Sequence, residues 1–328
     1  MYLVTGGAGF IGSHVVAALS DRGQDVVVCD WLRDDERWRN LAKHDLVDII
    51  QPESLPAWLR LRSTKLTAVL HMGAVSATTE TDVDLIVTRN IRATQDILAW
   101  CTEAQVPLIY ASSAATYGDG SQGFDDAFTR EALAKLRPLN AYGWSKHVVD
   151  RRLASMVANG EPLPPQWVGL KFFNVYGPNE YHKGTMKSVI AHNYPILRRG
   201  EKMRLFRSYR SDYPDGGQLR DFIYVRDCAE VILWFLDNPR LSGLFNLGTG
   251  RARTWMDLAV ALHSAMRLTP DIEIIEMPPE LRGKYQYFTE ARMDRLREVG
   301  YTRPFTTLED GIHDYVSRYL AREEDPYR

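Results

Sequence analysis

The sequence contains few cysteines and no long apolar run. Its three cysteines, Cys29, Cys101 and Cys228, are odd in number and far apart in the 328-residue chain. This spacing excludes a disulfide framework and a Cys-x-x-Cys metal site. No apolar stretch is long enough for a membrane helix, and the N-terminus has no basic segment of the kind found in signal peptides. We therefore expect a cytoplasmic protein with no metal and no membrane partner.

An excess of charge is also missing. The 40 basic and 42 acidic residues leave a net charge of -2, which gives no reason to expect a nucleic-acid partner. Repeats and low-complexity tracts are absent as well. With 45% hydrophobic and 25% charged residues, the composition is that of a globular protein of one or two domains.

Short β-branched runs alternate with longer amphipathic ones. Residues 2–5 (YLVT) precede a helical pattern that starts near Ile11 and stops at Gly23, and residues 25–30 (DVVVCD) follow. Later apolar runs occupy residues 68–71, 107–113 and 167–173. Strands that take turns with helices predict an α/β fold with a doubly wound parallel sheet.

The pattern changes after Phe173. Two loop-like stretches, 174–184 and 208–222, are long enough to suggest functional loops. We predict a Rossmann domain over residues 1–172, to which residues 221–255 return. A smaller C-terminal α/β lobe for the substrate is then formed by residues 173–220 and 256–328.

The stretch VTGGAGFIG lies between the first strand and the first helix. Gly7, Gly9 and Gly12 are in G-x-G-x-x-G register, and Gly6, Gly9 and Gly12 in G-x-x-G-x-x-G register. Such glycines let backbone N–H groups and the helix N-terminus approach a diphosphate. A glycine turn without a ligand is the alternative, but the acidic residue described next favours a dinucleotide.

Asp30 ends the second strand near the offset expected for a carboxylate that binds the adenosine ribose. Asp30 by itself favours NAD. Arg33 and Arg37 follow closely and could neutralise the 2′-phosphate of NADP, although a solvent-exposed helix face explains them equally well. We predict NADP as the cofactor, with NAD as the alternative.

Tyr142 and Lys146 are spaced to share one face of a helix, and Ser113 ends a strand. An ammonium beside a phenol, helped by the positive nicotinamide, stabilises the phenolate, and a serine hydroxyl can bind a substrate oxygen. The Tyr-x-x-x-Lys pattern also occurs by chance, with a core tyrosine and a surface lysine. The glycine loop and the strand-end serine, in the expected order, favour catalysis.

The stretches TGGAGFIG, YASSAATYG and YGWSK resemble the extended short-chain dehydrogenase/reductase family, which acts largely on nucleotide sugars. More stretches resemble the branch of that family that epimerises ADP-linked heptoses at C6 for the lipopolysaccharide core. They are residues 73–82, 172–189, 219–227, 244–255 and 284–289. The resemblance spans nearly the whole chain and implies a homo-oligomer that binds an ADP-sugar.

The resemblance also implies which residues form the site. Cofactor contacts would come from Gly6, Gly9, Phe10, Ile11, Gly12, Asp30, Trp31, Arg37, Met72, Gly73, Ala74, Val75, Ser76, Asn90, Tyr142 and Lys146. Substrate contacts would come from Ser113, Asn174, Val175, Lys183, Thr185, His192, Phe206, Arg207, Ser208, Tyr209, Arg220 and Tyr285.

Three positions depart from the family pattern. Arg37 stands where lysine is frequent, which keeps the charge but changes its geometry. Thr185 replaces a serine and keeps the hydroxyl. The insertion 209–217 lengthens the loop that precedes Arg220.

A second lysine, Lys183, fits the epimerisation that the resemblance implies. A carbinol carbon without a neighbouring carbonyl is inverted by oxidation to a planar ketone and reduction from the opposite face. Because the alcohol oxygen points to different sides in the two orientations, two acid/base groups are useful, and we expect Tyr142 and Lys183 to serve in turn. Lys146 would then tune Tyr142. A phosphate clamp or a solvent-facing lysine is the alternative for Lys183.

Two other functions compete with this one. A different nucleotide-sugar epimerase or a 4,6-dehydratase could use the same fold, but the dehydratase would require an Asp-Glu pair that SSAATYG lacks. A non-catalytic protein that senses NADP would have no need to keep Ser113, Tyr142 and Lys146 together.

Overall fold

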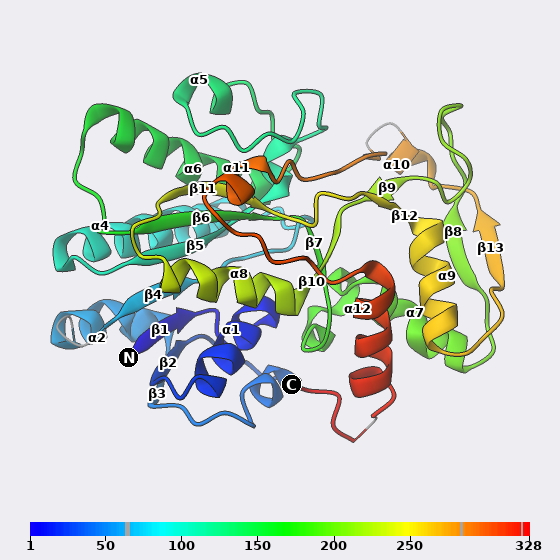
Figure 1. Cartoon of the computed structure of the whole chain (residues 1–328), viewed down its shortest axis with the longest axis horizontal. Helices are drawn as coiled ribbons and strands as arrows, with labels where there is room; N and C mark the ends of the chain where they lie inside the picture. Colours follow the sequence, from blue (N-terminus) through cyan, green and yellow to red (C-terminus); the bar gives the residue numbers. More distant parts are fainter. Residues whose placement is uncertain (63–65, 283–284, 323) are drawn as a thin grey trace.

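The computed structural model describes residues 1–62, 66–282, 285–322 and 324–328 (Figure 1). Its centre is a parallel sheet of seven strands in the order β11-β6-β5-β4-β1-β2-β3. The strands are β1 Tyr2–Thr5, β2 Val26–Cys29, β3 Asp48–Ile50, β4 Ala68–His71, β5 Leu108–Ser113, β6 Trp167–Phe172 and β11 Gly243–Leu247. The order reverses between β1 and β4, as in a doubly wound sheet. This confirms the predicted fold class.

Helices connect the strands and extend beyond them. The α-helices are α1 Phe10–Asp21, α2 Leu55–Arg62, α3 Val83–Ile86, α4 Ala93–Ala104, α5 Arg130–Leu133, α6 Ala141–Asn159, α7 Val189–Arg198, α8 Val225–Asp237, α9 Trp255–Ala265, α10 Pro279–Arg282, α11 Asp294–Glu298 and α12 Leu308–Tyr315. Short 3₁₀ segments are η1 Glu36–Asn40, η2 Pro52–Ser54, η5 Ala114–Tyr117 and η6 Tyr181–Met186. Single π-helical turns are η4 Val87–Arg92 and η7 Val316–Leu320.

Successive residues of a strand point to opposite faces of the sheet, and in the central sheet residues on both faces are buried. Leu3 packs in a cluster with Ile97 of α4, whereas Val4 packs in another with Val15 of α1 and Ile232 of α8. Complete burial of each such side chain contributes about 1.5 to 3 kcal/mol. Apolar residues at consecutive strand positions therefore require helices on both faces, and this produces the three-layer domain.

A smaller lobe lies beside the carboxyl ends of the strands. Figure 1 shows α7, α9, β8 and β13 grouped together away from the main sheet. Its two-stranded ladders pair β7 Asn174–Tyr176 with β10 Phe222–Tyr224, β9 Leu219–Arg220 with β12 Arg253–Thr254, and β8 Met203–Phe206 with β13 Ile272–Ile275. A third apolar cluster joins α7, α9 and α12 in this lobe. The expected C-terminal α/β lobe is therefore present, while the boundaries proposed for the two domains stay predictions.

None of the helices within residues 1–62, 66–282, 285–322 and 324–328 is both long and apolar enough to cross a membrane. No group of three or more histidine, cysteine or acidic side chains in the same ranges is arranged to hold a metal ion.

Candidate active site

The glycine loop lies between β1 and α1, at the point where the strand order reverses. Gly6 has a φ of +66°, and a Cβ on Gly12 would lie 2.0 Å from the Gly6 carbonyl oxygen, so both positions require glycine. Gly9 is the N-cap of α1 and has no side-chain capping bond. The first-turn N–H groups of Phe10 and Ile11 therefore belong to an uncapped helix end, which stabilises an anion such as a diphosphate.

A cavity of about 690 Å³ opens beside Asp30, which directly follows β2. The Asp30 carboxylate accepts hydrogen bonds from the N–H groups of Ala8 (3.0 Å) and Trp31 (2.8 Å), so the glycine loop fixes its position. The cavity is lined by Asp30, Trp31, Leu32, Arg33, Ile49, Ile50, Gln51, Val75, Leu85 and Arg89. Its size and its mixture of apolar and polar groups fit an adenosine whose ribose meets Asp30.

Arg89 is a cavity residue that the sequence did not reveal. Its guanidinium lies 4.2 Å from the centre of the Trp31 ring and 3.5 Å from the Glu53 carboxylate. The Trp31 indole also donates to Glu53, at 2.9 Å. Trp31, Glu53 and Arg89 come from three separate segments, and together they form one wall beside the cavity.

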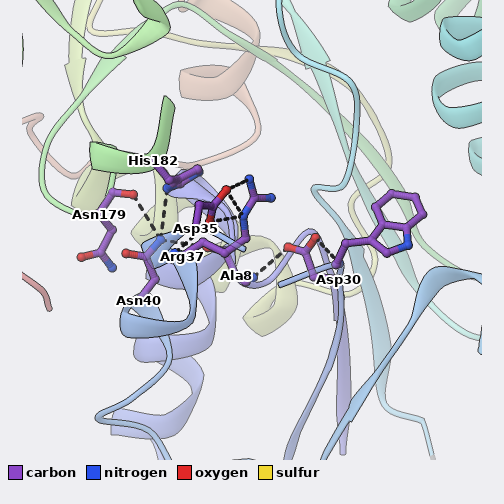
Figure 2. Close-up of polar contacts among 8 residues, drawn as sticks. Ala8, Asp30, Asp35, Arg37, Asn40, Asn179 and His182 are labelled. Carbon is purple, nitrogen blue, oxygen red and sulfur yellow. Dashed lines mark hydrogen bonds and ion pairs between the residues drawn. The ribbon is translucent and has the colours of Figure 1, made fainter. Parts of the chain in front are cut away.

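Arg37 lies on the other side of Asp30 (Figure 2). Its guanidinium is directed at the Asp35 carboxylate, with Nε–Oδ1 at 2.8 Å and Nη2–Oδ2 at 2.6 Å. Arg33 is exposed, has a φ of 52° and lines the cavity. Of the two arginines expected near the ribose, one therefore faces the cavity and the other already has an anionic partner.

The loop after β4 carries the predicted cofactor residues 72–76. Asn90 holds this loop from behind, because its Oδ1 accepts from the Val75 N–H at 2.8 Å and its Nδ2 donates to the Val75 carbonyl at 3.0 Å. Nδ2 also donates to the Ser145 hydroxyl on α6, at 3.0 Å. The buried Asn90 side chain thus positions the loop, and Ser76 is the exposed residue within it.

Ser113, Tyr142 and Lys146 come together at the end of β5 and the start of α6. The Asn140 side chain caps α6 by accepting from the Gly143 N–H at 2.8 Å, which fixes the helix start beside Tyr142. The Tyr142 phenol is hydrogen-bonded to Ser113. Lys146 is buried one turn further along the same helix. A strand-end hydroxyl, a phenol and an ammonium can bind a substrate oxygen and move its proton.

The pKa of Tyr142 differs from the expectation based on sequence. Burial raises the pKa above its ordinary value, and the hydrogen bond from Ser113 opposes this only in part. Burial also lowers the pKa of Lys146 to about 8, while the nearby Asp150 carboxylate raises it. In the protein alone, desolvation is therefore the larger of the two effects on the pKa of Tyr142.

A buried ion pair lies beneath these groups. The Lys171 ammonium on β6 is 2.9 Å from Asp150 on α6, and neither side chain has exposed surface. Asp150 also accepts from the hydroxyls of Tyr110 (3.0 Å) and Ser112 (2.8 Å), and Lys171 donates to Thr116 (2.6 Å). The pair therefore ties α6 to β5 and β6, the elements that hold Tyr142 and Ser113.

Lys183 lies in η6, away from the Ser113 group in sequence. Its ammonium is 5.1 Å from the centre of the Phe10 ring, at the start of α1. Burial lowers the pKa of Lys183, and the nearby Glu180 carboxylate opposes this shift. A lysine with a lowered pKa beside the glycine-loop helix is suited to exchange protons near a bound dinucleotide.

Polar contacts anchor the Lys183 loop to the glycine loop. The buried Asn40 amide donates to the carbonyl oxygens of Ala8 (2.8 Å) and Asn179 (3.3 Å) and lies 3.5 Å from His182 Nδ1 (Figure 2). The Asn179 amide in turn donates to the Ser13 hydroxyl on α1, at 3.0 Å. The position of Lys183 is therefore coupled to the position of the cofactor-binding loop.

A second group of predicted substrate residues meets in the C-terminal lobe. The buried Arg220 guanidinium lies 5.3 Å from the centre of the Tyr285 ring and 5.8 Å from that of Trp255. Tyr285 packs edge-on against Phe206, with ring centres 6.2 Å apart. A cation enclosed by aromatic rings can bind a phosphate or stack on a base. Trp255 was not among the predicted contacts.

The segment after Phe206 is held by ionic and aromatic contacts. Arg207 pairs with Glu276 at 2.8 Å, and the Tyr209 hydroxyl donates to the same carboxylate. The Ser208 N–H donates to Asp215 in the insertion, at 2.7 Å. The insertion therefore folds back on the segment 206–209, which was predicted to contact the substrate.

The remaining predicted substrate residues are dispersed. Asn174 is exposed and Val175 half-buried on β7, and Thr185 is exposed with its carbonyl 3.1 Å from His192 Nε2. Of the stretch 284–289, Lys284 lies outside the described residues.

The sequence model of the NAD dependent epimerase/dehydratase family matches residues 2–248. The chain belongs to this family. It is 50% identical over 330 residues to the ADP-L-glycero-D-manno-heptose-6-epimerase of Nitratidesulfovibrio vulgaris, with 100% of both chains covered. It is 44% identical over 333 residues to the enzyme of that name from Fusobacterium nucleatum, with 99% of both covered.

Solved structures of family members are similar throughout. The crystal structure of Helicobacter pylori ADP-L-glycero-D-manno-heptose-6-epimerase has a TM-score of 0.77 at 27% identity and covers 97% of this chain and 95% of its own. The Thermus thermophilus UDP-glucose 4-epimerase complex with NAD has a TM-score of 0.72 at 28% identity, covering 95% and 96%. The resemblance expected from the motifs is confirmed, and as a member of this epimerase/dehydratase family the chain uses a nicotinamide cofactor.

Proposed function

We propose that the protein converts ADP-D-glycero-D-manno-heptose to ADP-L-glycero-D-manno-heptose for the lipopolysaccharide core. Full-length relatives at 50% and 44% identity bear the name of this epimerase. The observation that carries the proposal is the position of two ionisable side chains, each of which would exchange a proton with the sugar beside the cofactor. Tyr142 is hydrogen-bonded to Ser113 at the end of β5, and Lys183 lies over the Phe10 ring at the start of α1.

The C6–H bond of the heptose is not acidic, so inversion requires oxidation to a 6-keto sugar and reduction of its other face. The bound nicotinamide would accept the hydride and return it. Tyr142 would take the hydroxyl proton in one sugar orientation, with Ser113 binding the same oxygen. Lys183 would serve the other orientation. Lys146 would hold the nicotinamide ribose and favour the Tyr142 phenolate.

The C-terminal lobe would hold the ADP part. Arg220 and the aromatic rings of Phe206 and Tyr285 form a cationic, stacking-competent group that suits a nucleoside diphosphate. Asn174, Val175, Thr185 and His192 would line the path between this group and Lys183.

Of the two nicotinamide cofactors, we propose NADP, with NAD as the alternative. Support comes from Arg33 on the cavity wall and from Arg37 beside Asp30. We further propose a cytoplasmic homo-oligomer, and a division into the two domains predicted from the sequence.

Purified protein incubated with ADP-D-glycero-D-manno-heptose tests the function. NMR of the product should show inversion at C6 alone. UDP-glucose and dTDP-glucose are the matched control substrates, and we expect neither to be epimerised at C4 nor dehydrated. Turnover of a control substrate without turnover of the heptose would refute the assignment and favour another epimerase or a 4,6-dehydratase.

A further inference from the structure

The pairing of Arg37 with Asp35 has no role in the function proposed so far. Three contacts of 2.6 to 3.1 Å join the Arg37 Nε and Nη2 atoms to both oxygens of the Asp35 carboxylate. The Arg37 side chain is 16% exposed and that of Asp35 33% exposed. The two-pronged geometry is the one in which a guanidinium binds a carboxylate or a phosphate.

Local backbone structure holds Asp35 in this place. Asp35 is the N-cap of η1, and its Oδ1 accepts from the Arg37 N–H at 3.0 Å. The same carboxylate therefore binds the backbone and the side chain of one residue, which limits its rotation. The hydrogen bond from Arg37 lowers the pKa of Asp35, so the carboxylate is ionised at neutral pH.

Arg37 is also within electrostatic reach of Asp30. The Asp30 charge contributes to the raised pKa of Arg37, after the larger effect of Asp35. Because Asp30 is the proposed partner of the adenosine ribose, Arg37 would lie near a 2′-phosphate on that ribose, where NAD carries a hydroxyl. The Arg37–Asp35 pair has no net charge to offer this phosphate.

We infer that Asp35 is a specificity-determining residue: its carboxylate competes with the 2′-phosphate for the Arg37 guanidinium and narrows the preference for NADP over NAD. The inference rests on the proposed NADP cofactor and on the position of Arg37. NADP binding must either displace the Asp35 carboxylate from Arg37 or make the phosphate share the guanidinium with it. NAD binding requires neither.

Calorimetric titration with NADP⁺ and with NAD⁺ tests the inference without any turnover. Asp35→Ser removes the charge but keeps an N-cap hydroxyl for η1. We expect it to bind NADP⁺ about three- to tenfold more tightly than the wild type, with NAD⁺ affinity changed by less than about twofold. The control is Asp34→Ser, which removes the same charge from the exposed neighbouring residue and should leave the ratio of affinities unchanged.

Asp35→Ser in an Arg37→Ala background tests whether Asp35 acts through Arg37. In an Arg37→Ala background, Asp35→Ser should no longer favour NADP⁺ selectively, because the group under competition is gone. An equal gain for both cofactors, an equal effect of Asp34→Ser, or a selective gain without Arg37 would each overturn the inference. So would weaker NADP⁺ binding by Asp35→Ser, which would mean that Asp35 orients Arg37 for the phosphate. If the wild type binds neither cofactor, the proposed function fails together with this inference.

Discussion

Replacement of Lys183 by methionine separates proton transfer from binding. The Lys183 ammonium contacts the Phe10 ring and is half-buried, so its cation–π contribution to the fold is about 1 kcal/mol or less. Methionine keeps an apolar chain against the same ring. If Lys183 exchanges the substrate proton in one of the two orientations, its loss should slow epimerisation by about a hundredfold or more, equivalent to about 2.7 kcal/mol in the barrier. The chemical effect thus exceeds the structural one.

The assay compares Lys183→Met with Tyr142→Phe, and with Lys187→Met as a control from the same loop. Each of the first two should lose the epimerase rate while still binding the cofactor. An ADP-sugar analogue with an aldehyde at C6 can disproportionate without the full epimerisation cycle, and only the double variant should lose this reaction as well. A higher KM with unchanged kcat in Lys183→Met would show that the lysine is a binding contact, and the two-base reasoning would fail.

Three further predictions concern stability and assembly. Burial lowers the pKa of Lys146 to about 8 from its ordinary 10.5, so the unfolded chain binds more protons than the folded chain between these pH values. The free energy of unfolding should therefore rise as the pH rises from 8 to 10.5. In urea titrations of Lys146→Met, this rise should be smaller by up to about 3 kcal/mol. Asn40→Ala leaves the carbonyl oxygens of Ala8 and Asn179 without their buried donor. It should therefore lower the free energy of unfolding by about 2 to 4 kcal/mol in the same assay. A loss below about 0.5 kcal/mol, the size expected of a surface substitution, would contradict the role of this buried network. Sedimentation at micromolar concentration should show an oligomer, and a monomer would contradict the proposed assembly.

Local patterns explain what the sequence could reveal. The glycine loop, Asp30 and the Tyr142–Lys146 spacing each depend on one strand or one helix, whose periodicity is visible in a short window. Ser113 could be placed because strand ends meet at one edge of a parallel sheet. The doubly wound sheet followed from the same alternation of strands and helices.

Contacts between distant segments were not visible in the sequence. Arg89 reaches Trp31 and Glu53 only because η4 brings it to the edge of the cavity, and its side chain has no local feature that marks it. At Arg37 the positive charge was predicted from the sequence, but its pairing with the Asp35 carboxylate was not. That pairing depends on a short 3₁₀ turn, which no apolar periodicity announces.

The Lys171–Asp150 pair also limits which substitutions can be tolerated at these two positions during evolution. Loss of either partner leaves the other buried charge without its ion-pair partner, at a cost of about 3 to 5 kcal/mol. Joint replacement by apolar side chains of similar size is often close to neutral. A lineage could therefore exchange both residues but would rarely survive the intermediate. We expect the two positions to change together among related sequences, although 21 residues separate them along the chain.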